Sequence, residues 1–117
     1  MKVCKLKSNC KITCEYIVNA LGSSDKFVER ELASHIISFI SGDCKITVYT
    51  SEFYYNRISS TLTITLVIEE TKEDTVVNLI SSGGKARMAL TSLGAESSAL
   101  NIVLSTLKKI GFVIIKN

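Results

Sequence analysis

The sequence predicts an α+β domain: a single layer of antiparallel meander sheet, of about four to six strands, packed against two or three helices that include a long C-terminal helix. Three observations support this prediction. Thr61–Ile68 alternates polar and apolar residues with the two-residue period of a strand. The charged segment Glu69–Asp74 then separates it from a second apolar run, Thr75–Ile80, as in a hairpin. Apolar residues of Glu96–Ile110 recur at helical spacing.

Length and composition indicate one globular domain over residues 1–117. Of the 117 residues, 46% are hydrophobic. The net charge of +3 is too small to indicate a polyanionic partner, so nucleic-acid binding ranks third among our hypotheses, although the charged residues before Glu15 are all lysine. We expect a cytoplasmic protein, because no apolar run has the length of a secretory signal core or a membrane span.

The N-terminal part is predicted to form a strand and two helices. Val3–Lys7 alternates weakly, as a short strand does. Ser8-Asn9 then offers an N-cap for a first helix, which ends at Gly22 as a left-handed C′ residue. In Phe27–Ile40 a helix is the first choice, because five apolar residues fall at helical spacing: Val28, Leu32, Ile36, Phe39 and Ile40. A strand is the alternative, because its β-branched residues favour extended structure.

Four strands of a meander are predicted next. The turn Ser41–Asp43 leads into a strand that begins at Cys44 and runs to Tyr55, and Asn56–Ser60 turns the chain into the hairpin described above. After a break at Gly83-Gly84, alternation over Lys85–Thr91 predicts the fourth strand.

The C-terminal helix is predicted to begin at Gly94-Ala95-Glu96 and to end at Gly111, a fitting C′ residue. Glu96 in its first turn and the lysines in its last turn each oppose the helix dipole. Phe112–Ile115 either adds a closing strand or packs back on the sheet.

The four cysteines are expected to be reduced, since we predict no secretory signal. Cys10 and Cys14 share one helical stripe with Ile17 and Leu21, so we interpret them as buried thiols in preference to metal ligands. We predict no metal and no cofactor. His35, the only histidine, is interpreted as a structural or surface residue because no nucleophile motif flanks it.

Short motifs lie in three segments: VYTSEFYYNRISSTLTITLV (Val48–Val67), LISSGG (Leu79–Gly84) and LTSLGAESSALNIVLSTL (Leu90–Leu107). They contain a tyrosine-rich strand, an Asn-Arg turn, a Ser-Gly-Gly break and a Gly-Glu helix start, the last with Ala95 inserted. This pattern resembles a small bacterial family of uncharacterised proteins known only as a domain of unknown function. The resemblance implies a cytoplasmic bacterial protein with no assigned activity, and it carries over no catalytic residue.

An aromatic cluster beside arginine residues is the candidate binding surface. Half of the eight aromatic residues fall between positions 49 and 55, where they could stack on a ligand, although packing within the sheet is the alternative. The glycine pair beside Arg87 could contact an anion, although a turn or bulge is its default role. The full candidate set is Tyr49, Phe53, Tyr54, Tyr55, Arg57, Gly83, Gly84 and Arg87.

Enzyme activity is disfavoured because no catalytic constellation is visible. Glu69, Glu70, Glu73 and Asp74 lie on a hairpin tip, where solvent leaves them without the perturbed environment that catalysis uses. Our first hypothesis is a small non-enzymatic binding or self-associating domain, with itself or another protein as partner. Its contact surface is the tyrosine strand or the semi-polar second face of the sheet: Thr63, Thr65, Val67 and Tyr49. The alternative is a helix-grip-like carrier of a small apolar ligand, with a cavity between the sheet and the C-terminal helix.

Overall fold

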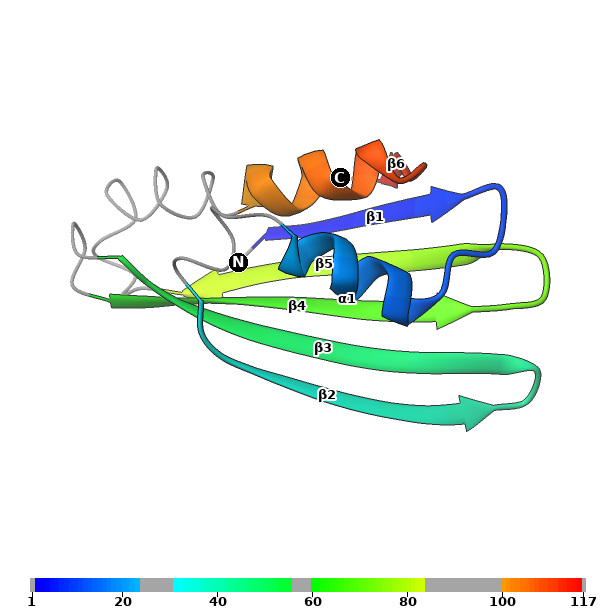
Figure 1. The fold of residues 1–117 in the computed structure, drawn as a ribbon, viewed down its shortest axis with the longest axis horizontal. Helices are drawn as coiled ribbons and strands as arrows, with labels where there is room; N and C mark the ends of the chain where they lie inside the picture. The colour runs from blue at the N-terminus through cyan, green and yellow to red at the C-terminus, as the bar shows by residue number, and fades with distance from the viewer. Residues whose placement is uncertain (1, 24–30, 56–59, 84–99, 117) are drawn as a thin grey trace.

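The computed structural model describes residues 2–23, 31–55, 60–83 and 100–116. These residues form a six-stranded antiparallel sheet in the order β2-β3-β4-β5-β1-β6, so the predicted α+β class is confirmed (Figure 1). The strands are β1 (Lys2–Ser8), β2 (Glu31–Ser41), β3 (Cys44–Tyr55), β4 (Ser60–Glu70), β5 (Thr75–Gly83) and β6 (Val113–Lys116). The described helices are α1 (Cys14–Gly22) and the C-terminal helix, residues 100–109.

Four strands that are consecutive in the sequence, β2–β5, form a meander that begins at one edge of the sheet, and its members differ from those predicted. The helix predicted for Phe27–Ile40 is wrong over its described part, which is β2. A two-residue turn joins β2 to β3. Its first residue, Gly42, has φ 62°, a positive value that the tight turns of twisted hairpins require. Pairing with β3 along nearly the whole of β2 therefore outweighs the helical spacing of its apolar residues. The strand predicted over Lys85–Thr91 lies outside the described residues.

The position of β1 in the sheet does not follow the order of the sequence, because β1 lies between β5 and β6. Its predicted alternation is confirmed: Cys4 and Leu6 are buried, whereas Val3 and Lys7 are exposed. The choice left open for Phe112–Ile115 is resolved, because β6 adds a short edge strand next to β1. Both edges of the described sheet are thus defined, β2 on one side and β6 on the other.

Helix α1 begins and ends at different residues from those predicted. The Thr13 hydroxyl caps it by accepting from the Tyr16 N–H at 3.2 Å, whereas Ser8 ends β1, so the predicted Ser8-Asn9 cap is wrong. Cys10 consequently precedes the helix and is exposed, which corrects its assignment to the buried stripe. Gly22 is the last residue of α1, and Ser23 follows as C-cap with φ −84°, so the predicted role of Gly22 as the left-handed C′ residue is wrong.

The C-terminal helix ends as predicted, at Gly111 with φ 117°. The Gly111 N–H donates to the Lys108 carbonyl at 3.2 Å, and the Phe112 N–H donates to the Leu107 carbonyl at 3.0 Å. These two bonds form a Schellman motif, which reverses the chain into β6. The helix is therefore followed by a strand, and its predicted start at Gly94-Ala95-Glu96 lies outside the described residues.

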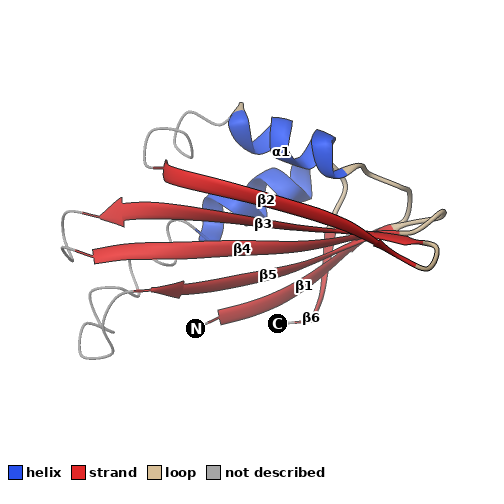
Figure 2. Cartoon of the chain, turned by 90° about the horizontal axis from the view of Figure 1, so that it is seen from below, coloured by secondary structure: helices blue, strands red, loops and turns tan. Residues whose placement is uncertain are grey.

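Both described helices lie on one face of the sheet, here called the inner face, and the opposite face is called the outer face (Figure 2). The alternation predicted for β4 is confirmed, since Leu62, Ile64, Leu66 and Ile68 all point inward and are buried. They pack with the apolar sides of the helices, including Ile17, Leu21, Val103 and Leu107. The outer face carries half-buried side chains such as Thr65 and Val67.

Candidate functional site

The residues of the candidate binding surface do not form one surface in the described part of the structure. Tyr49 and Phe53 lie on the inner face of β3, where they pair with Leu66 and Leu62 and are 5% and 2% exposed. Tyr49 therefore does not share the second face with Thr63, Thr65 and Val67, which corrects that part of our hypothesis. Tyr54 and Tyr55 end β3, and Gly83 ends β5. Arg57, Gly84 and Arg87 lie outside the described residues, and their role stays a prediction.

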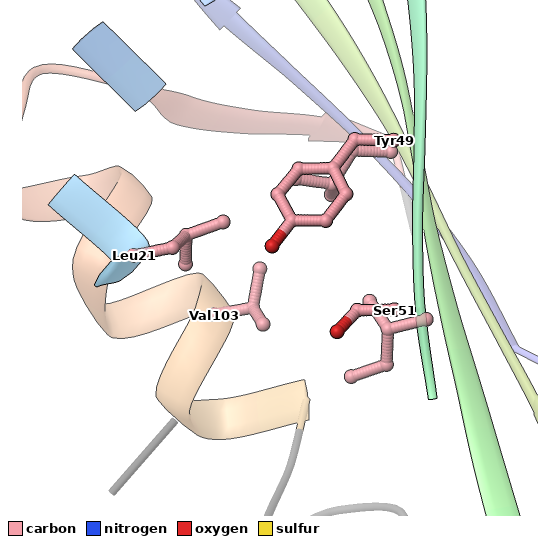
Figure 3. A pocket seen from close by; sticks show the side chains of 6 residues that line it. Leu21, Tyr49, Ser51 and Val103 are labelled. Carbon is pink, nitrogen blue, oxygen red and sulfur yellow. The ribbon is translucent and has the colours of Figure 1, made fainter. Parts of the chain in front are cut away.

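Tyr49 instead lines a narrow space between the sheet and the two helices (Figure 3). The hydroxyl groups of Tyr49 and Ser51 point into it from β3, and Leu21 and Val103 face them from the helices. No water-sized space remains inside it, and its remaining walls are Ile64 and Leu66. Pockets that hold drug-sized ligands measure roughly 300–1,000 Å³. This space is therefore a gap in the core packing and does not favour a ligand carrier.

A polar cluster lies where α1 begins. Glu70, on the inner face of β4, is 4% exposed, and its Oε2 has no hydrogen-bond partner among the described residues. Burial raises the pKa of the Cys14 thiol, a hydrogen bond with Thr47 opposes that rise, and the negative charge of Glu70 adds to it. A thiol with a raised pKa is a weak nucleophile at neutral pH. The positive end of a helix dipole suits a buried carboxylate, so we assign this cluster to the packing of α1 on the sheet.

Two ion pairs flank the sheet at its surface. Lys45 Nζ lies 3.3 Å from Glu15 Oε1, and Lys7 Nζ lies 3.3 Å from Asp74 Oδ2. The hydroxyl of Thr71 donates to Asp74 Oδ1 at 2.7 Å, and this bond, helped by Lys7, lowers the pKa of Asp74. Within the described ranges no three His, Cys, Asp or Glu side chains are grouped to hold a metal ion. The contacts of Asp74 hold the turn between β4 and β5, and the pair of Lys45 with Glu15 holds the first turn of α1 to β3.

Four of the eight large apolar side chains that are exposed in the described part of the chain lie within five residues of the edge strand β2. Ile36 and Ile40 point to the inner side and are 52% and 77% exposed. Ile37 and Phe39 point to the outer side and are 66% and 50% exposed. Among the strands that the structure describes, none lies beyond β2 (Figure 2). This strand, with apolar groups open on both of its faces, is the candidate functional site.

The sequence analysis missed this site because it placed Ile36, Phe39 and Ile40 on one side of a helix. A strand puts alternate residues on opposite faces. Each of the adjacent pairs Ile36-Ile37 and Phe39-Ile40 therefore places one apolar side chain on each face of the strand. A one-sided sheet buries only one face of its strands. The β-branched residues gave the strand alternative, which is confirmed over the described part, and the two adjacent apolar pairs were the further signal that could have favoured it.

Comparisons with known proteins identify a family for this chain. No described helix is long and apolar enough to cross a membrane. A search of curated proteins gave no match, and a search of solved structures gave none either. Residues 2–111 match a family described as a family of unknown function (DUF6054), which agrees with the resemblance noted in the motifs. The match covers nearly the whole chain, and the protein therefore belongs to the DUF6054 family.

Proposed function

We propose that this protein is a small non-enzymatic binding domain that acts by self-association through β2. The observation that carries the proposal is the exposure of four large apolar side chains within five residues of one edge strand. Single exposed apolar residues are ordinary, but a contiguous apolar patch marks an interaction surface. Covering a large apolar side chain stabilises a complex by as much as about 1.5–3 kcal/mol, so four neighbours supply a substantial driving force.

The two edges of the sheet differ in a way that supports this proposal. Natural proteins protect edge strands with short length, lysine or proline, because an open edge can pair with another chain. β6 is only four residues long and ends in Lys116. β2 has 11 residues, and from Leu32 to Ser41 it contains no Lys, Arg, Asp, Glu or Pro. One edge is thus protected against pairing, whereas the other is open to it.

The rival proposal, a carrier of a small apolar ligand, needs an interior cavity. The described space between β3 and the helices has no room for even a water molecule, whereas sites for drug-sized ligands measure roughly 300–1,000 Å³. The polar groups around Asp74 and Glu70 also have local structural roles, the first in a turn and the second at the start of α1. Of the two candidates, the binding domain is therefore the one that the geometry favours.

Analytical ultracentrifugation across the micromolar range tests the proposal. We expect the wild-type protein to form a dimer with rising concentration, and Phe39→Lys to weaken it because a charge enters the apolar patch. Val113→Lys is the matched control, since Val113 is similarly exposed on the outer side of the opposite edge strand, and it should leave association unchanged. A wild-type protein that stays monomeric throughout, or equal effects of the two substitutions, would refute the proposal.

A further inference from the structure

We infer that two copies of this chain join edge to edge, with β2 of one copy running antiparallel to β2 of the other about a two-fold axis at Ser38. The six-stranded sheets then form one continuous sheet. This inference rests on the proposed self-association and adds its geometry, which the association itself leaves open. A dimer of sheets stacked through their outer faces is the competing arrangement.

Exposure on both faces of β2 favours the edge over the face. Stacking through the outer faces would cover Ile37 and Phe39 but leave Ile36 and Ile40 in water, because these two point to the helix side. A neighbouring strand at the edge brings side chains alongside all four residues, since its own side chains also alternate between the two faces. Edge pairing therefore accounts for the whole patch.

The order of residues along β2 suits pairing with itself. The segment Ile36-Ile37-Ser38-Phe39-Ile40 has the same sequence of apolar and polar residues in both directions. In an antiparallel pair centred on Ser38, Ile36 lies opposite Ile40 of the second copy, and Ile37 lies opposite Phe39 of the second copy. Directly opposite residues share a face, so each apolar side chain meets another one on its own side of the sheet.

Charge and regularity agree with this register. Between Leu32 and Ser41 no formally charged residue can meet a like charge from the second copy. From Ala33 to Ser41 the strand pairs with β3 without a register shift, so its free edge is not interrupted by a bulge there. Shifting the centre by one residue, to Ile37, would place Ile36 opposite Ser38 and lose the apolar match. The pattern thus selects one register among its neighbours.

Two lysine substitutions distinguish edge pairing from face stacking. Ile40 lies on the helix side of the edge, whereas Val67 lies on the outer face of the interior strand β4. Edge pairing predicts that Ile40→Lys raises the dimer dissociation constant by about tenfold or more and that Val67→Lys leaves it nearly unchanged. One strand pair makes a small interface, so measurements should extend to high micromolar concentration. Circular dichroism of each variant checks that it is folded.

The outcomes of the two substitutions distinguish edge pairing, face stacking and the absence of self-association. If Val67→Lys dissociates the dimer and Ile40→Lys does not, the sheets stack, and edge pairing is wrong while self-association stands. If neither folded variant weakens the dimer, edge pairing is likewise wrong. A wild-type monomer refutes the self-association itself, and the edge pairing with it.

If both substitutions weaken the dimer, disulfide formation decides between the arrangements. In a Cys10→Ser, Cys44→Ser background, Ser38→Cys places two thiols opposite each other, with Cβ atoms about 4.5–5.5 Å apart, close to disulfide range. Ile36→Cys is the matched control on the same face of the same strand, because its two copies would lie about 13 Å apart along the pair. A disulfide-linked dimer with Ser38→Cys alone supports the register. Equal linking by both variants, or linking by neither, overturns it.

Discussion

The side-chain hydroxyl of Thr75 is bonded twice to the backbone of Ile12, donating to its carbonyl and accepting from its N–H, each at 2.8 Å. Thr75 is fully buried at the start of β5, and Ile12 lies between β1 and α1. One threonine thus satisfies both backbone groups of a buried residue distant in the chain. It fixes the segment that leads into α1 against the sheet.

Replacing Thr75 by valine should destabilise the protein by about 2–3 kcal/mol, because valine keeps the shape but leaves the N–H and carbonyl of Ile12 buried without partners. Urea unfolding at neutral pH measures this. Thr63→Val is the matched control, since Thr63 is half-buried on the outer face of β4, and it should change the free energy of unfolding by less than about 0.5 kcal/mol. Similar effects of the two substitutions would show that the double hydrogen bond contributes little.

Asp74 should make stability depend on acid pH. The Thr71 hydroxyl and Lys7 hold the pKa of its carboxyl below the usual range in the folded state, so the folded protein binds this proton less readily than the unfolded chain does. The resulting stabilisation is fully present above the unfolded pKa of about 3.9 and is lost as pH falls through the lower folded pKa.

Asp74→Asn should therefore lower stability at neutral pH, and its difference from wild type should vanish below the folded pKa. Urea unfolding at a series of pH values follows this difference. Glu73→Gln, which changes an exposed carboxyl in the same turn, is the control and should leave the acid dependence nearly unaltered. An Asp74→Asn difference that stays constant from neutral to strongly acid pH would contradict the assignment.

The four thiols should react with iodoacetamide in an order set by burial. Cys10 is exposed, whereas Cys4 and Cys14 are buried, and burial raises the pKa of both buried thiols. Because the thiolate is the reactive form, Cys10 should be alkylated well before these two in the folded protein. Peptide mass spectrometry after timed quenching measures each rate, and the differences should largely disappear in denaturant. Rapid labelling of Cys14 under native conditions would be evidence against its buried position.

Local patterns were sufficient to predict three strands of the meander, β3, β4 and β5. The alternation of Leu62, Ile64, Leu66 and Ile68 predicted the buried face of β4, and Gly111 predicted the helix end, because both signals depend on neighbouring residues alone. The structure of β2 could not be predicted in this way. Its apolar residues satisfy a helical period and a strand period together, and pairing with β3 decides between the two.

The candidate site depended on distant contacts even more strongly. Whether Tyr49 faces the core is decided by its pairing with Leu66, and nothing in the tyrosine-rich segment specifies that partner. In the same way, β2 becomes an open edge only because β1 pairs with β5 and β6 on the far side of the sheet. The cap at Thr13 was missed because Ser8, an equally good capping residue, occurs first in the chain.

The place of β1 in the sheet has a consequence for how the chain folds. β1 precedes the meander in sequence, yet both of its neighbours, β5 and β6, come from far later. The hairpins of β2–β5 close short loops and can form early, whereas β1 must bring together segments separated by most of the polypeptide. During synthesis β1 precedes both of its neighbours, so we expect its apolar side to lack its strand partners until β5 and then β6 have been translated.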